Sequence, residues 1–154
     1  MSRVRILGIG SPSGDDQAGW LTVDALSATS MKGDDGILIA KLDRPGANLI
    51  PLLETADHVI LIDAMQGGGR VGEIQRFDQK DWAGYSHGLS SHGFGVLAAL
   101  SLARELGSLP PQMELYGIAI GPVRPGEEAG QDVQAAAQRL AAMIVSRLEK
   151  GEAP

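Results

Sequence analysis

The sequence contains no cysteine. This absence excludes disulfide bonds, a thiol nucleophile, zinc sites built on thiolates and iron–sulfur clusters. Any metal ligands in the chain must therefore come from carboxylates, imidazoles or other oxygen and nitrogen groups.

Positive charge is also scarce and does not cluster. The chain has 13 Lys and Arg against 19 Asp and Glu, for a formal net charge of −6. This balance argues against binding to nucleic acid or to anionic membrane surfaces. The apolar run at the N-terminus is too short for a signal peptide, and none is long enough to span a membrane. We therefore expect a cytoplasmic protein whose 154 residues form a single domain, residues 1–154.

Residues 4–19 are the stretch around which the rest of the sequence is organised. An apolar run over residues 4–9 predicts a buried strand, and the glycines and proline that follow predict a tight loop. Two adjacent acids, Asp15 and Asp16, come next, where a helix is expected to begin. A strand, a glycine loop and a helix start are typical of a ligand site at the carboxyl edge of an open α/β sheet.

This loop does not fit a dinucleotide site. After Gly8 and Gly10 the fingerprint requires a third glycine three residues on, where this sequence has Ser13. Asp15 and Asp16 would moreover repel a phosphate. One of the two acids can be interpreted as a helix cap, but the second then still needs an explanation.

The rest of the sequence alternates between strand-like and helix-like segments. We predict further strands at residues 37–40, 58–63, 71–77 and 113–120, and helices at about residues 17–27, 49–53, 93–106 and 131–148. The continuous apolar run of the third strand indicates a central position, and the alternating pattern of the fourth indicates an exposed edge. This order predicts a three-layer α/β/α fold with a mostly parallel, twisted sheet of about five strands.

Three polar residues are expected at one edge of this sheet. Asp16 follows the first strand, Asp63 ends the third, and His92 opens the helix after the fourth. Two carboxylates and an imidazole from three elements make a three-ligand site for a divalent ion such as nickel or zinc, with positions open for substrate. Asp63 can also be read as a turn cap and His92 as a structural histidine, whereas His58 is expected to be structural.

A second motif matches that of serine hydrolases, but the sequence around it does not fit such an enzyme. Residues 84–88 match the nucleophile elbow G-x-S-x-G, with Ser86 at its centre. The elbow requires a buried strand before it, and then an acid and a histidine later in the chain. Residues 80–83 form no such strand, no acid lies between Ser86 and His92, and no histidine follows His92. We therefore do not expect a serine hydrolase.

Taken together, these motifs resemble those of the hydrogenase maturation endopeptidases. The glycines and acids of residues 8–16 are similar to the first motif of that family, residues 59–64 to the second, and residues 90–93 to the third. Gly117 and Ile118 fit as well. The likeness extends over nearly the whole chain, and the order and spacing of the motifs carry it.

The resemblance implies an α/β endopeptidase that removes a C-terminal peptide from the large-subunit precursor of a [NiFe] hydrogenase. It implies that Asp16, Asp63 and His92 contact a metal and serve catalysis, and that this metal is nickel already placed in the precursor. Zinc or cadmium would be surrogates for nickel. The chain is expected to act as a monomer. Without cysteine or a credible serine nucleophile, attack by water on a peptide carbonyl near the metal is one possible mechanism.

The sequence also departs from the family pattern around the expected site. Ser11 stands where an asparagine is usual, Gln17 where a glycine is common, and residues 42–46 lack the small Gly/Thr pattern. Two alternatives therefore stay open. One is a small nucleotide- or metabolite-binding α/β module with Asp43 as the ribose-binding acid, although Asp43 lies further downstream than expected. The other is a nickel checkpoint or chaperone protein that does not cleave.

Overall fold

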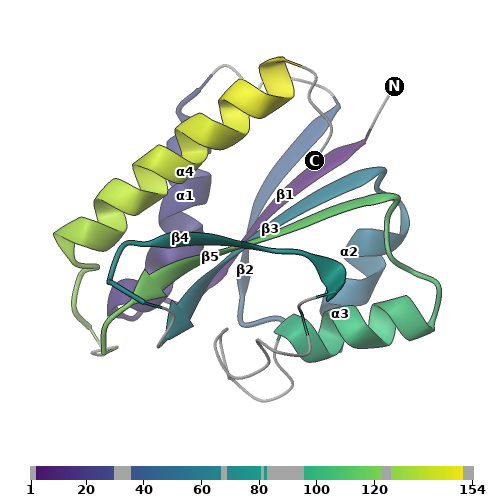
Figure 1. Ribbon diagram of the computed structural model, residues 1–154, viewed down its shortest axis with the longest axis horizontal. Coiled ribbons are helices and arrows are strands. Elements are labelled where there is room, and N and C mark those ends of the chain that lie inside the picture. Colours follow the sequence, from purple (N-terminus) through teal and green to yellow (C-terminus); the bar gives the residue numbers. More distant parts are fainter. Residues whose placement is uncertain are drawn as a thin grey trace.

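The computed structural model describes residues 3–29, 36–66, 69–80, 82, 96–122 and 126–150. Five strands form one sheet in the order β2-β1-β3-β5-β4 (Figure 1). The strands are β1 (Val4–Gly10), β2 (Ile37–Asp43), β3 (His58–Gln66), β4 (Ile74–Phe77) and β5 (Gln112–Ile120). All neighbouring pairs are parallel except β4 with β5, which is antiparallel. The predicted α/β class and the mostly parallel five-stranded sheet are confirmed.

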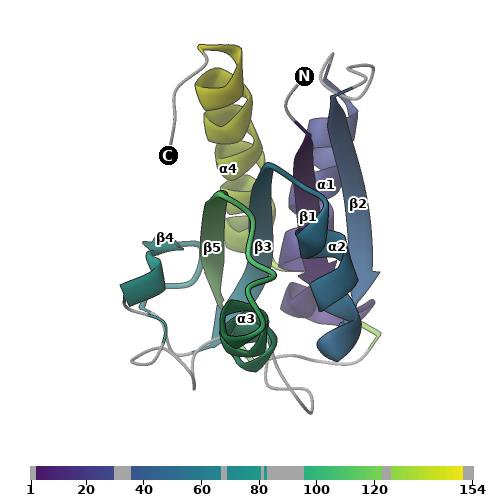
Figure 2. The ribbon, with the colours of Figure 1, turned by 90° about the vertical axis from the view of Figure 1, so that its right-hand side faces the viewer.

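Helices cover both faces of the sheet (Figure 2). One face carries α1 (Ala18–Ser27) and α4 (Gln131–Glu149), and the other carries α2 (Ile50–Glu54) and α3 (Val96–Glu105). The 3₁₀ turns η1 (Gly14–Gln17) and η3 (Ala47–Leu49) lead into α1 and α2. No helix of the described residues is long and apolar enough to cross a membrane.

Strand β3 explains why the core has two halves. Its side chains alternate between the faces, so that Val59 and Leu61 pack towards α2 and α3, while Ile60 and Ile62 pack towards α1 and α4. All of these side chains are buried. A strand covered on both faces presents apolar side chains to both layers, and this is why residues 59–62 read as a continuous apolar run.

Two glycines let α1 lie close against the strands that end at the site. A Cβ atom on Gly19 would come within 2.3 Å of the Ile9 carbonyl oxygen and 2.6 Å of the Ile62 carbonyl oxygen. On the sheet side, a Cβ atom on Gly8 would come within 2.3 Å of the Gly19 carbonyl oxygen. The first turns of α1 are therefore held directly over the ends of β1 and β3.

Three strand boundaries differ from the prediction by three residues each. The strand expected at residues 37–40 continues to Asp43, because it pairs with β1 as far as Gly10. The strand expected from residue 71 begins only at Ile74, because a turn precedes it in which Gly72 has φ +91° and the Glu73 N–H donates to the Arg70 carbonyl at 2.9 Å. Strand β3 was expected to end at Asp63 but continues to Gln66, since β5 pairs with it along its whole length. The predicted stop at Gly107, with φ +70°, does follow α3.

Candidate functional site

The two acids predicted for the site lie near the ends of neighbouring parallel strands. Asp16 lies in η1, directly after β1, and Asp63 lies in β3, which pairs with β1. The turn η1 also contacts β3. Asp16 is 4% exposed and Asp63 is fully buried. The structure thus brings these two acids to the same edge of the sheet, as the sequence predicts.

Asp16 is held through the residue that follows β1. The Ser11 hydroxyl donates a hydrogen bond to Asp16 Oδ2, and the Ser11 N–H donates to the Asp16 carbonyl at 3.3 Å. The Asp16 N–H donates to the Ser13 carbonyl at 3.0 Å, which closes the turn. The position of Asp16 is therefore set by a tight loop and a hydroxyl. The importance of Ser11 was missed at the sequence level, where it stood out only as a departure from the family.

Asp63 is held from within its own strand. Its Oδ1 accepts a hydrogen bond from the Ala64 N–H at 2.8 Å. The prediction that the strand ends at Asp63 is wrong, because β3 continues past it and Asp63 lies in register with Gly117 of β5. A side chain on a central strand has little freedom to move, and the site is anchored on this position.

Asp15 has a different role from Asp16. Its Oδ1 accepts a hydrogen bond from the Gly130 N–H at 2.7 Å, and its Oδ2 accepts one from the Gly121 N–H at 3.2 Å. Neither η1 nor α1 receives a capping hydrogen bond from the side chain at its own N-cap position. The adjacent acids therefore have different contacts. Asp15 accepts hydrogen bonds from backbone amides beyond β5, whereas Asp16 belongs to the turn that contacts β3.

The third predicted ligand, His92, lies outside the described residues, as does the 84–88 motif. Among the described residues, no group of three or more His, Cys, Asp or Glu side chains is arranged to hold a metal ion. The fourth strand is antiparallel and does not end at the edge where Asp16 lies. Helix α3, which begins four residues after His92, has its N-terminal end on the side where the parallel strands end (Figure 1).

The glycines in the last part of β1 are used for packing. A Cβ atom on Gly10 would come within 2.6 Å of the Asp16 carbonyl oxygen and 3.2 Å of the Trp20 ring. Gly8 faces the backbone of Gly19 in the same way. Both glycines are therefore explained by the close approach of η1 and α1, which removes the main argument for a nucleotide at this loop.

A second group of ionisable side chains lies towards the end of the sheet at which the parallel strands β3 and β5 begin. Glu114 of β5 is 1% exposed. Its Oε2 lies 2.5 Å from His58 Nε2, and its Oε1 accepts hydrogen bonds from the Tyr116 hydroxyl at 2.8 Å and from Arg147 Nη1. Arg76 Nη1 lies 3.8 Å from the same oxygen. The structural role expected for His58 agrees with this arrangement.

The pKa values of this group are shifted in opposite directions. Burial acts to raise the pKa of Glu114, but the hydrogen bonds from His58, Tyr116 and Arg147 outweigh burial and lower this pKa from 4.5 to about 2. Burial and the hydrogen bond to Glu114 raise the pKa of Tyr116 to about 12. At neutral pH, Glu114 is therefore an anion and Tyr116 a neutral donor.

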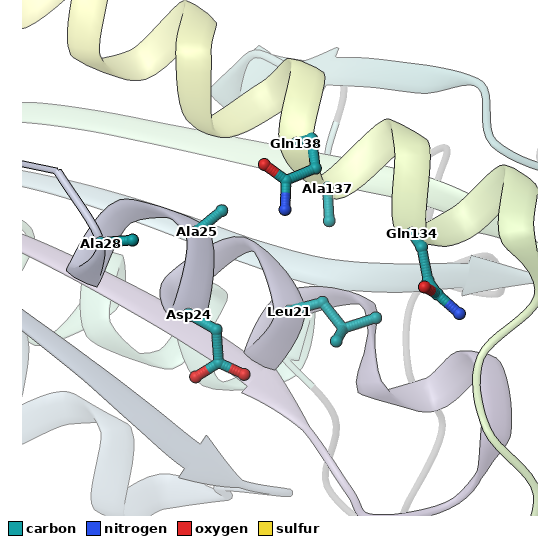
Figure 3. A pocket seen from close by; sticks show the side chains of 7 residues that line it. All are labelled: Leu21, Asp24, Ala25, Ala28, Gln134, Ala137 and Gln138. Atoms are coloured by element: carbon teal, nitrogen blue, oxygen red, sulfur yellow. The ribbon is translucent and has the colours of Figure 1, made fainter.

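A groove of about 250 Å³ lies between α1 and α4 (Figure 3), and neither Asp16 nor Asp63 lines it. It is lined by Leu21, Asp24, Ala25, Ala28, Gln134, Ala137 and Gln138. The only acid in this lining, Asp24, lies 2.6 Å from Lys41 Nζ. Small and amide side chains dominate the lining, so the groove offers no chemistry comparable to that of the sheet edge.

The reactive groups at this edge of the sheet are the buried carboxylates of Asp16 and Asp63. Burying an ionised carboxylate is costly unless hydrogen bonds or a cation compensate its charge. Carboxylate oxygens are ligands for divalent cations, and acids or bases in hydrolysis. This edge of the sheet therefore offers carboxylate oxygens as ligands for a cation.

Comparisons with known proteins agree on one family. The sequence model of the hydrogenase maturation protease family, HycI, matches residues 44–147. The protein HydD of Wolinella succinogenes is 34% identical over 91 residues, which cover 54% of this chain and 50% of that protein. The matched part thus spans half the length of that relative.

Solved structures show the same fold. The [NiFe] hydrogenase maturation protease HycI from Thermococcus kodakarensis KOD1 is 26% identical, with a TM-score of 0.77 over 96% of this chain and 93% of that chain. The hydrogenase maturating endopeptidase HybD from E. coli is 21% identical, with a TM-score of 0.79 over 97% and 93% of the respective chains.

Proposed function

Because the chain belongs to the hydrogenase maturation protease family, we propose that it is an endopeptidase that removes a C-terminal peptide from a [NiFe] hydrogenase large-subunit precursor. In this proposal the nickel is part of the substrate. The protease contacts it through Asp16, Asp63 and His92, and thereby recognises a precursor that has received its metal. Zinc or cadmium could replace nickel in binding experiments.

The observation that carries the proposal is the pair of buried carboxylates at neighbouring strand ends. Asp16 is 4% exposed and Asp63 is 0% exposed. Their side chains accept hydrogen bonds from the Ser11 hydroxyl and the Ala64 amide. Such hydrogen bonds orient a carboxylate that serves as a ligand. In the proposal, the ion that these carboxylates meet is nickel carried by the precursor.

The residues of this chain support hydrolysis by positioning. The absence of cysteine excludes a thiol nucleophile. In the proposed mechanism, Asp16, Asp63 and His92 hold the nickel-bearing end of the precursor so that the scissile peptide lies in a fixed place. Water then attacks the peptide carbonyl, and the nearby metal polarises this carbonyl. Accurate positioning alone contributes several orders of magnitude to such a reaction.

The test is the intact mass of a co-expressed large-subunit precursor, with and without nickel in the medium. We expect loss of a C-terminal peptide only with nickel. Asp63→Asn and His92→Ala should each slow this processing by roughly a hundredfold or more, because each removes a proposed contact to the substrate. Asp78→Asn, which changes an exposed acid outside the site, is the matched control and should process normally.

The possible outcomes separate the parts of the proposal. Processing by both Asp63→Asn and His92→Ala at wild-type rate would overturn the site assignment. Trimming that does not depend on nickel would leave the protease activity standing and remove nickel recognition. A precursor that co-purifies with the chain at unchanged length, with nickel loading confirmed, would identify a checkpoint protein that does not cleave.

A further inference from the structure

Hydrogen bonds join the loop after β1 to the loop after β5. Asp15 accepts from the Gly130 N–H at 2.7 Å and from the Gly121 N–H at 3.2 Å. The Gly14 N–H donates to the Glu127 carbonyl at 2.9 Å. These contacts fasten η1 to the far end of β5 and to the start of α4.

Asp15 acts here as a remote helix cap. Gly130 is the N-cap residue of α4 and has no side chain with which to cap the helix. The Asp15 carboxylate, 115 residues away in the sequence, binds its free N–H instead. A negative charge at this end of α4 is also favoured by the helix dipole. Helix α4 and η1 are thereby fixed relative to one another.

The same turn carries Asp16. Since η1 spans only Gly14–Gln17, Asp15 and Asp16 share a single turn of backbone. Ser11 binds Asp16 from the β1 side, and Asp15 fastens the turn from the β5 side. Any shift of η1 away from β5 would move the Asp16 carboxylate relative to Asp63.

We propose that Asp15 is a positioning residue, which sets the place of the Asp16 carboxylate by clamping η1 to Gly121 and Gly130. This inference rests on the proposed function, in which Asp16 contacts the nickel of the precursor. It also explains why two acids stand side by side. Both oxygens of Asp15 accept hydrogen bonds from backbone amides, so Asp15 serves the site through Asp16 and is not itself a contact to the substrate.

The direct test is Asp15→Asn, measured by processing kinetics on nickel-loaded precursor. An amide in place of the carboxylate has one oxygen, so one of the two glycine N–H groups loses its acceptor. We expect kcat to fall about tenfold to a hundredfold, as for outer partners of other binding residues, while KM for the precursor stays the same. Asp132→Asn is the matched control. It also removes one negative charge near the N-terminus of α4, because Asp132 lies in the first turn of this helix. It should leave kcat unchanged.

A second measurement does not depend on activity. In ¹⁵N-labelled protein, Asp15→Asn should shift the amide resonance of Ser11, whose N–H donates to the Asp16 carbonyl, as well as those of Gly121 and Gly130. Asp132→Asn should leave Ser11 in place. If Ser11 does not move, or if kcat is unchanged although both glycine amides have shifted, the positioning role is overturned.

Failure of the proposed function can be told apart from failure of the clamp. A wild-type protein that never trims the precursor would refute the proposed function, and the amide shifts alone would then decide the clamp. If Asp15→Asn does not fold, Asp15→Glu takes its place, because it keeps the charge and both acceptor oxygens but is longer by one methylene. A folded Asp15→Glu protein with a shifted Ser11 amide and wild-type kcat would equally overturn the inference.

Discussion

Glu114 and Asp63 are both almost completely buried carboxylates on the paired strands β5 and β3, but their described partners differ in charge. Glu114 lies against His58, Tyr116 and Arg147, and Arg76 is 3.8 Å away. The hydrogen bond described for the Asp63 side chain comes from a backbone amide. Within one sheet, the buried negative charge of Glu114 is thus compensated by arginines of the chain, whereas the Asp63 carboxylate is oriented from its own strand.

This difference between Glu114 and Asp63 suggests that one carboxylate serves the stability of the fold and the other serves the proposed function. The chain itself supplies the cations that compensate Glu114, so this group belongs to the folded protein whether or not a substrate is bound. At the edge formed by Asp16 and Asp63, the described donors fix direction, and the proposed cation arrives with the precursor. We therefore expect substitutions at Glu114 to affect stability and substitutions at Asp63 to affect processing.

The largest expected effect is that of Glu114→Gln on folding. The variant leaves the Arg147 guanidinium, whose side chain is 22% exposed, facing a neutral amide, and breaking a largely buried pair of this kind costs about 3 kcal/mol. Urea unfolding at pH 7 measures this loss. Asp63→Asn should change the free energy of unfolding by less than about 1 kcal/mol, since active-site acids are often not optimal for stability. The reverse order of the two variants would refute the comparison.

A second prediction concerns acid. Folding lowers the pKa of Glu114 from 4.5 to about 2, so its carboxylate stabilises the fold fully above pH 4.5, and this contribution disappears as the pH falls towards 2. At about 1.4 kcal/mol for each pH unit of lowering, the contribution is about 3 kcal/mol. Urea unfolding at several pH values should show this loss in the wild type and a flatter profile in Glu114→Gln. Equal slopes for the two proteins between pH 4.5 and pH 2 would contradict the assignment to Glu114.

The smallest expected effect lies beside the site, at Arg44. This residue has φ +43°, a left-handed conformation that favours glycine, and it is the only residue other than glycine with positive φ in the described ranges. Its N–H donates to the Gly10 carbonyl at 3.1 Å. Arg44→Gly should raise the free energy of unfolding by about 0.5 kcal/mol, because it relieves strain that outweighs the extra freedom of glycine in the unfolded chain. Arg44→Lys keeps the strained backbone and should leave the free energy of unfolding unchanged. A lower free energy of unfolding for Arg44→Gly would show that the contacts of the Arg44 side chain stabilise the fold by more than its backbone strain destabilises it.

Local patterns were sufficient to predict most of the fold. The apolar run of β3 predicts a strand covered on both faces, and the alternation of strands and helices predicts parallel pairing. The antiparallel direction of β4 and the extension of β3 to Gln66 were not predictable in this way. The extension of β3 depends on how far β5 continues beside it, and the direction of β4 depends on how this edge strand docks against β5. Neither partner can be seen in the local sequence of β3 or β4.

The site was predictable in part for the same reason. Asp16 and Asp63 follow from the rule that parallel strands end at one edge. The partners of Asp15 lie 106 and 115 residues away, so no local pattern identifies them. Glu114 gave a weaker signal, namely one acid within an otherwise apolar strand, but its compensation by Arg147 requires the docked position of α4.

The remote cap on α4 also has a consequence for the order of events during synthesis. Chains emerge from the ribosome N-terminal end first, and contacts between distant residues must wait for the later one to appear. The β1 loop with Asp15 is made early, but Gly121 and Gly130 follow more than a hundred residues later. The turn that carries Asp16 therefore reaches its final place only after the last strand has joined the sheet and the last helix has begun to form. A half-made chain cannot have a finished site, and the protein acquires this geometry only as one of the last steps of its own folding.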